Sequence, residues 1–198
     1  MENITFDLLN MHRYGTAFYD YLKMRKQVFV DELGWDIPHN DFVEMDQYDN
    51  PMTHYSLVVR DGVLLGGARA MSTMAEWNGA GCMLNDIIEG KLPTIPTSVI
   101  DTPIKTPRVW ECSRLVMAED IGSAEDRAEC LALIVDGLAE MARAQGADEL
   151  MSLTRLPLLR ALRQLGWACD RIGTPYTQGG RSYAVLSMPA TKLAAVAA

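Results

Sequence analysis

The 198-residue sequence lacks the features of several large classes of protein. No apolar run approaches the roughly 20 residues that a transmembrane helix needs. The opening MENITFDLLN does not join a basic start to an apolar segment, as a secretion signal does. These absences favour a cytoplasmic protein without a membrane span. A formal net charge of −8 also argues against nucleic acid as a general partner.

Cysteine and histidine are present without the spacing of a metal site. The four cysteines, at positions 82, 112, 130 and 169, stand singly, and the three histidines are equally dispersed. A zinc site would need cysteine or histidine pairs separated by about two to four residues. We therefore expect reduced cysteines and no structural metal.

What the sequence does contain is an alternation of strand and helix patterns. Strands are expected at 4–10, 108–117, 148–154, 167–173 and 181–188, a hairpin at 53–72 that turns at Asp61-Gly62, and helices at 14–33, near 83–89, at 123–146 and at 155–166. This order predicts an α/β fold, with helices on both faces of a mixed sheet, in a three-layer α-β-α arrangement. We expect one domain over residues 1–198, with a frayed tail at 189–198.

Charged residues occur where the patterns predict burial. Arg25 falls within the apolar stripe of the helix 14–33, Arg69 follows the paired glycines of LLGGA, and the strand VWECSRL carries Glu111 and Arg114. By strict alternation Arg114 shares a face with Trp110, and Glu111 lies on the opposite face. A buried charge needs a partner, because an unpaired one costs several kcal/mol.

The candidate partners of these arginines are Glu111 and two carboxylates, Asp46 and Asp49, of the acidic loop 35–52, which is long enough to be functional or mobile. Two interpretations stay open. The ion pairs could pin the loop to the sheet, or the same groups could surround a charged small molecule, and the two are compatible.

Four short motifs resemble those of the acyl-homoserine-lactone synthase family, the autoinducer synthases of bacterial quorum sensing. They are R-x-x-V-F-x-x-x-L-x-W from Arg25 to Trp35, E-x-D-x-Y-D from Glu44 to Asp49, G-G-A-R ending at Arg69, and W-E-x-S-R from Trp110 to Arg114. The resemblance implies a twisted, cleft sheet related to the N-acetyltransferases. It also implies transfer of an acyl chain from acyl carrier protein to the amine of S-adenosylmethionine (SAM), followed by lactonisation and release of methylthioadenosine. SAM is then a substrate, and no cofactor is expected.

The resemblance also implies roles for individual residues. Arg25, Phe29 and Trp35 would bind SAM, so that Arg25→Ala would lose SAM while keeping its fold. Glu111, Arg69, Arg114, Asp46 and Asp49 would form the catalytic set, with Glu111 as the best candidate for the base that deprotonates the amine. Met151, Ser152 and Leu153 would line the acyl-chain pocket.

The acyl donor and two alternative functions stay open. The segment AEDIGSAED, 118–126, has one glycine and four acids, a poor cradle for the pyrophosphate of coenzyme A. It suits a carrier protein, whose acidic surface could meet Arg155, Arg160 and Arg163, without excluding acyl-CoA. The alternatives are an N-acetyltransferase that uses a CoA thioester on another amine, and a catalytically silent ligand-binding relative. Departures such as Leu115 after the last motif leave the acyl chain length open.

Overall fold

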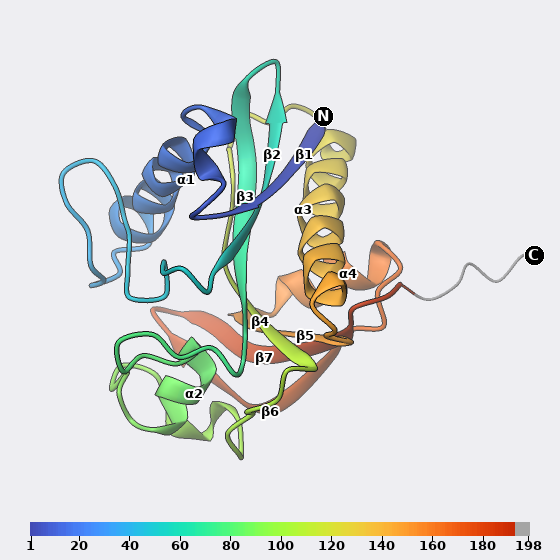
Figure 1. Ribbon diagram of the computed structural model, residues 1–198. Coiled ribbons are helices and arrows are strands. Elements are labelled where there is room, and N and C mark those ends of the chain that lie inside the picture. The colour runs from blue at the N-terminus through green and yellow to red at the C-terminus, as the bar shows by residue number, and fades with distance from the viewer. Residues whose placement is uncertain (193–198) are drawn as a thin grey trace, which may run out of the picture. The chain divides into compact units, whose positions relative to one another are not determined.

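A computed structural model describes residues 1–192, and within them the strands form a seven-stranded mixed sheet (Figure 1). The strand order is β1-β2-β3-β4-β5-β7-β6; β4 and β5 run parallel, and the pairs β1–β2, β2–β3, β5–β7 and β6–β7 are antiparallel. The strands are β1 Glu2–Asp7, β2 His54–Arg60, β3 Val63–Ser72, β4 Val109–Met117, β5 Glu149–Arg155, β6 Asp170–Gln178 and β7 Arg181–Pro189. The helical segments are η1 Met11–Tyr14, α1 Ala17–Arg25, η2 Lys26–Glu32, α2 Met83–Ile88, η3 Thr97–Val99, α3 Ala124–Ala144 and α4 Pro157–Gln164. The predicted α/β class is confirmed.

The chain divides into two compact units, each built from two segments. The first contains residues 1–70 and 114–141, and the second contains residues 71–113 and the described residues from 142 onward. Strands β3 and β4 contribute to both units. That the whole chain acts as one domain stays a prediction.

In the first unit, α1 and α3 cover opposite faces of the strands. Tyr21 and Leu22 of α1 pack with Tyr55 and Leu57 of β2 in one apolar cluster. Ser56 lies between these two strand residues, and its hydroxyl donates a hydrogen bond of 2.9 Å to the carbonyl oxygen of Ile134 in α3. Because neighbouring residues of a strand point to opposite faces, this pattern places a helix on each side.

The expected helix 14–33 is divided into three parts. Gly15, with φ of 57°, separates η1 from α1, and the chain then continues from α1 into η2, which is a π-helix over Lys26–Glu32. Phe29 in the π-helix still joins Leu22 in the apolar cluster, as the stripe predicted. Gly34, with φ of 66°, follows the last turn. π-Helical turns are rare in proteins, and many of those that occur lie at functional sites.

The long helix α3 begins with a reciprocal cap. The hydroxyl oxygen of Ser123 accepts a bond of 3.1 Å from the backbone N–H of Asp126, and the Asp126 carboxylate accepts one of 3.1 Å from the backbone N–H of Ser123. Arg60 donates to the same carboxylate at 2.5 Å. Ser123 is therefore the predicted N-cap, and the protein's own carboxylate occupies this helix end.

The second unit contains β5, β6, β7, α2 and α4. Gly166, with φ of 89°, follows α4 as predicted. Pro189 ends β7, and the backbone N–H of Ala190 donates to the Asp148 carbonyl oxygen at 2.8 Å. The remainder of the expected frayed tail, 193–198, lies outside the described residues. Along residues 1–192, every helix is too short or too polar to cross a membrane.

Gly66 confirms the close backbone approach predicted from LLGGA. A Cβ atom at this position would lie 2.7 Å from the carbonyl oxygen of Val116 in the neighbouring strand β4. That oxygen belongs to the backbone of a buried strand, so it cannot move aside cheaply.

We expect Gly66→Ala to lower the free energy of unfolding by about 1–3 kcal/mol, because overpacking forces the two strands apart. Gly81→Ala is the control, since its Cβ would meet nothing closer than 3.5 Å. Urea denaturation measures both. Equal stability of the two variants would contradict the close approach.

Candidate functional site

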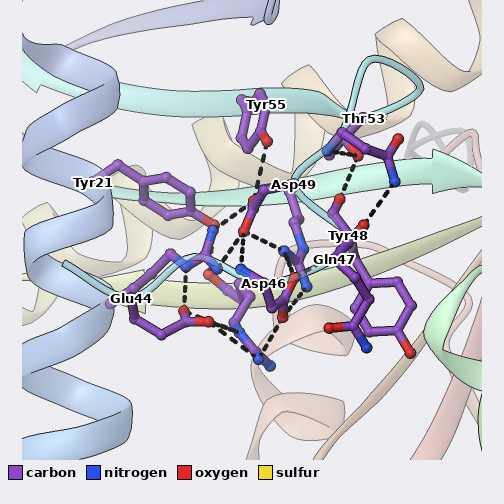
Figure 2. A network of polar contacts seen from close by, with 12 residues as sticks. Tyr21, Glu44, Asp46, Gln47, Tyr48, Asp49, Thr53 and Tyr55 are labelled. Atoms are coloured by element: carbon purple, nitrogen blue, oxygen red, sulfur yellow. Dashed lines mark hydrogen bonds and ion pairs between the residues drawn. The ribbon is translucent and has the colours of Figure 1, made fainter. Parts of the chain in front are cut away.

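Hydrogen bonds within the acidic loop orient its own carboxylates. The Asp46 carboxylate accepts a bond of 2.9 Å from the Tyr48 N–H, and the Asp49 carboxylate accepts one of 3.0 Å from the Asp46 N–H. The Thr53 hydroxyl donates to the Tyr48 carbonyl oxygen. Figure 2 shows Asp46 and Asp49 turned toward the same centre as Glu44. The loop therefore presents its carboxylates in a preset arrangement.

These carboxylates and three arginines form a closed ring of alternating charge. In order around the ring, hereafter the charge ring, the members are Arg25, Glu44, Arg114, Asp46, Arg69 and Asp49. Each guanidinium contacts two carboxylates, and each carboxylate contacts two guanidiniums. The ring joins the end of α1, the acidic loop, β3 and β4, and its formal charges sum to zero.

Two of the contacts in the charge ring are bidentate with both bonds shorter than 3.0 Å. Both Nη atoms of Arg25 donate to the Asp49 carboxylate at 2.8 Å, and its Nε donates to Glu44 at 2.6 Å. The Nη atoms of Arg69 donate to Asp46 at 2.6 and 2.9 Å. Paired N–H···O bonds of this kind fix orientation as well as charge. The carboxylate oxygens lie close enough together to resemble a cation site, but here the guanidiniums supply the positive charge.

Burial divides the ring into an inner and an outer part. The side chains of Arg25, Glu44 and Asp49 are 0% exposed, whereas that of Arg114 is 9% exposed. Burial alone would raise the pKa of the Asp49 carboxyl, but the charges of Arg69 and Arg25 lower it by more, so its pKa lies below the usual value. The pKa of Asp46 is lowered in the same way by Arg69 and Arg114. Both carboxylates are thus held in the charged form.

Aromatic side chains enclose the charge ring. The Tyr55 hydroxyl donates to Asp49 at 3.0 Å, and burial raises the pKa of this phenol. Phe29 and Trp35, predicted to line the SAM pocket, stack with ring centroids 4.9 Å apart. The Arg114 guanidinium lies over both rings, 5.2 Å from the Phe29 centroid and 5.9 Å from that of Trp35. The half-buried Trp35 places an aromatic face beside the outer part of the ring.

Arg114 has an unusual backbone. Its φ of 57° is in the left-handed region, which a non-glycine residue adopts at a cost of about 1–3 kcal/mol. The Tyr21 hydroxyl donates to the Arg114 carbonyl oxygen at 2.8 Å. The strict alternation expected for VWECSRL therefore does not continue through Arg114, because the backbone turns there and redirects the side chain.

The predicted ion pairs are confirmed for two of the three candidate carboxylates, and one carboxylate is added; the third candidate, Glu111, is not a member of the charge ring. Asp46 and Asp49 are partners of the three arginines, as expected. Glu44, which the E-x-D-x-Y-D motif contains, is not among the predicted partners, yet it binds Arg25 and Arg114. The same loop also carries Asp36 and Asp41, and its spacing alone does not distinguish Glu44 from them. Arg25, expected to grip SAM, is instead saturated by protein carboxylates.

Glu111 belongs to the second unit and is buried. Its carboxylate accepts a hydrogen bond of 2.7 Å from the backbone N–H of Leu84, in the first turn of α2. Asn85, the next residue of α2, bonds to the carbonyl oxygens of Thr73 and Ile104. No local pattern indicates this support, because the segments involved are far apart along the chain.

The three residues of β5 that are predicted to line the acyl-chain pocket point to different faces of the sheet. Glu111 pairs with Met151 in the parallel ladder between β4 and β5, so their side chains share one face of the sheet. Leu153 lies on that face too, whereas Ser152 points to the opposite face. The alternation therefore divides the three residues between the two faces of the sheet, and their role in binding an acyl chain stays a prediction.

Two of the three predicted docking arginines lie on one groove of the second unit. A groove of about 390 Å³ is lined by Arg160 and Arg163 of α4 together with Leu156, Leu159 and Gln164. Arg163 also bonds to the Cys169 carbonyl oxygen and to Asp170. Arg155 is exposed at the end of β5 and is not part of the lining.

Comparison with known proteins gives a consistent set of matches. The family model described as autoinducer synthase matches residues 10–196. An acyl-homoserine-lactone synthase from Acinetobacter nosocomialis is 31% identical over 180 residues, which cover 86% of this chain and 91% of that protein.

Two solved structures are also similar. The crystal structure of TofI in a ternary complex with an inhibitor and MTA is 25% identical, with a TM-score of 0.74 and coverage of 96% of this chain and 92% of that chain. The CoA-dependent acyl-homoserine lactone synthase BjaI, with SAM and isopentyl-CoA, has a TM-score of 0.74 over 94% of this chain and 82% of its own. At 18% identity, BjaI shows the shared fold alone.

Removing Arg25 should destabilise the first unit, in contrast to the expectation from sequence. We expect Arg25→Ala to lower the free energy of unfolding by about 3–5 kcal/mol, because Glu44 and Asp49 would stay buried without this partner. In the same helix, Lys23→Ala removes an exposed pair with Asp20 and should cost at most about 1 kcal/mol. Urea denaturation of both variants checks this, and wild-type stability of Arg25→Ala would contradict it.

The lowered pKa values of Asp46 and Asp49 predict a loss of stability in acid. Unfolded aspartates titrate near a pKa of about 3.9, so the stabilisation is complete above that pH and is lost as the pH falls toward the lower folded values. Denaturation at about pH 5, 4 and 3 measures this loss. The buried charge ring should retain its pH dependence in about 0.5 M salt, which screens exposed pairs. If the loss of stability in acid disappears in salt, it arises from exposed ion pairs and not from the charge ring.

Proposed function

The chain belongs to the autoinducer synthase family, and we propose that it converts SAM and an acyl thioester into an N-acyl-homoserine lactone with release of methylthioadenosine. It is an acyltransferase of the acyl-homoserine-lactone synthase type. The observation that carries the proposal is the charge ring, with the stacked Phe29 and Trp35 beside its outer part. The ring is neutral and its most exposed member, Arg114, lies over the aromatic pair, so the ring offers separate partners for the carboxylate and the amine of one zwitterion.

In this proposal Arg114, the most exposed member of the ring, and its neighbour Asp46 face the substrate, and the other members support them. Arg114 at the outer part contacts the carboxylate of SAM, and Asp46 beside it receives the amine. The aromatic faces of Phe29 and Trp35 suit the sulfonium and the adenine. Arg25 is fully buried, so it serves SAM binding by holding Asp49 and Glu44 in place and not by touching the substrate. Arg69 holds Asp46 in the same manner.

The first chemical step forms an amide. Glu111 takes a proton from the SAM amine, directly or through water, and the free amine attacks the carbonyl carbon of the acyl thioester. The new C–N bond forms as the C–S bond breaks, and the departing thiolate takes the proton that the attacking nitrogen loses and leaves as a thiol. The Leu84 N–H that donates to Glu111 keeps this carboxylate oriented. Met151 and Leu153 are the pocket residues retained for the acyl chain, and Ser152 is placed on the other face.

The second step closes the lactone. A carboxylate oxygen of the acylated intermediate attacks the carbon bound to the sulfonium, the C–O bond forms, and methylthioadenosine leaves with the electrons of the C–S bond. Sulfonium is a good leaving group, so correct placement of the carboxylate supplies much of the rate. Arg114 is the residue that fixes this placement.

We propose acyl carrier protein as the preferred donor. The start of α3, where a pyrophosphate would need free N–H groups, is capped by Asp126 and adjoins further acids. The groove with Arg160 and Arg163 offers positive charge to an acidic partner on a chain whose net charge is −8. The description of BjaI as CoA-dependent keeps acyl-CoA as the alternative donor.

We expect the purified protein, given SAM and a medium-chain acyl carrier protein, to release equal amounts of methylthioadenosine and an acyl-homoserine lactone, identified together by mass spectrometry. Glu111→Gln should lower kcat by about 10²–10⁴-fold, the range for loss of a general base. Acylation of another amine without methylthioadenosine would support the N-acetyltransferase alternative. SAM binding without turnover would support the silent relative.

The donor preference has its own test. Charge reversal by Arg160→Glu should raise KM for the acyl carrier protein roughly fivefold to tenfold, which corresponds to about 1–1.4 kcal/mol. KM for an acyl-CoA of the same chain should stay unchanged. Arg13→Glu, an exposed reversal in the first unit, is the matched control. If Arg160→Glu and Arg13→Glu raise KM for the acyl carrier protein equally, the groove is not its docking site.

A further inference from the structure

The candidate base Glu111 is hydrogen-bonded to a helix that is too short to be stable by itself. Its carboxylate accepts from the Leu84 N–H, and Leu84 belongs to the six-residue helix α2. Isolated helices shorter than about 12–15 residues are marginal in water. The position of this N–H must therefore be fixed by contacts between α2 and its surroundings.

The side chain of Asn85 supplies such contacts to two segments at once. Its Nδ2 donates to the Ile104 carbonyl oxygen at 2.9 Å and to the Thr73 carbonyl oxygen at 3.2 Å, and its Oδ1 accepts from the Ile104 N–H at 2.9 Å. The two bonds with Ile104 reproduce the pairing between adjacent strands. Asn85 is 2% exposed, so these bonds do not compete with water.

We propose that Asn85 is a positioning residue of the reaction, which fixes α2 so that the Leu84 N–H orients the Glu111 carboxylate toward the proton it removes. The inference rests on the proposed function, in which Glu111 is the base. Loss of the Asn85 amide frees α2 from the segments that end β3 and precede β4. Glu111 then loses a fixed donor, and misplacement of a catalytic group by about 1 Å can cost 10²-fold in rate.

Two neighbouring polar residues, Asp86 and Thr73, make contacts that differ from those of Asn85. Asp86 is paired with Lys91 and accepts from the Gly81 N–H, and these contacts fix the other side of α2. The Thr73 hydroxyl donates to the Thr106 carbonyl oxygen at 2.8 Å and accepts from the Thr106 N–H at 3.3 Å. These two hydrogen bonds of the Thr73 side chain join the same two segments and do not involve α2, which makes Thr73 a matched control.

The test compares Asn85→Ala, which removes the hydrogen bonds from α2 to the two segments, with Thr73→Val, which removes hydrogen bonds between the two segments. We expect Asn85→Ala to lower kcat about tenfold to a hundredfold with KM for SAM changed less than about threefold. Thr73→Val should keep kcat within about twofold. In a Glu111→Gln background, Asn85→Ala should have no further effect, because the two residues act as one unit. Asn85→Ser, which keeps a hydroxyl but not the two bonds with Ile104, replaces Asn85→Ala if that variant does not fold.

Hydrogen exchange gives a readout that does not need turnover. The Leu84 amide should exchange faster in Asn85→Ala than in the wild type and should keep wild-type protection in Thr73→Val. Equal kcat in the two variants, or a further loss in the Glu111→Gln background, would overturn the inference. If the wild type releases no methylthioadenosine with any donor, the proposed function fails. Unchanged Leu84 exchange in Asn85→Ala would separately refute the positioning.

Discussion

Six charges removed from water must neutralise one another, and this requirement shapes the first unit. Each guanidinium or carboxylate of the charge ring would cost several kcal/mol if it were buried alone. The closed alternation gives every member two opposite neighbours. Because the members come from α1, the acidic loop, β3 and β4, no element can shift without exposing a charge to an apolar surrounding. The ring therefore fixes the loop against α1, β3 and β4, because displacing any one member would leave its partners buried and unpaired.

The same requirement explains the unusual backbone around the ring. Arg114 adopts a left-handed φ that costs free energy, and its guanidinium gains contacts with Glu44 and Asp46. Strain of this kind persists where the surrounding structure fixes it, and it concentrates at functional sites. The π-helix that follows Arg25 carries Phe29 to the aromatic pair at the outer part of the ring. The π-helix and the left-handed Arg114 are thus the irregular segments that bring charge and aromatic surface together.

Patterns of burial and alternation predict most of the fold but not its irregularities. The hairpin at Asp61-Gly62, the cap at Ser123 and the close approach at Gly66 follow from local chemistry, and the structure contains each of them. A π-helix and a left-handed arginine do not follow from hydrophobic periodicity, because tertiary contacts impose them. This is why the alternation assigned to VWECSRL fails at Arg114.

The functional site, like the fold, could be predicted from the sequence only in part. Arginines in apolar settings indicate buried pairs, and the acidic loop supplies the partners. The pairing itself depends on three-dimensional distances, so the sequence does not single out Glu44 or show that Arg25 is saturated by protein carboxylates. The separation of Ser152 from Met151 needs no such distances, because it follows from the alternation of side chains along β5. The support of Glu111 by α2 joins segments whose sequences show no common pattern.

A crystal structure of the chain with SAM bound tests the central claim most directly. We predict that all the ion pairs of the charge ring persist in the complex, with the SAM carboxylate at Arg114 and its sulfonium or adenine against Trp35. A complex in which Arg25 has left Asp49 and Glu44 to grip the substrate would contradict this claim, because the ring would then be a resting arrangement and not the frame of the site.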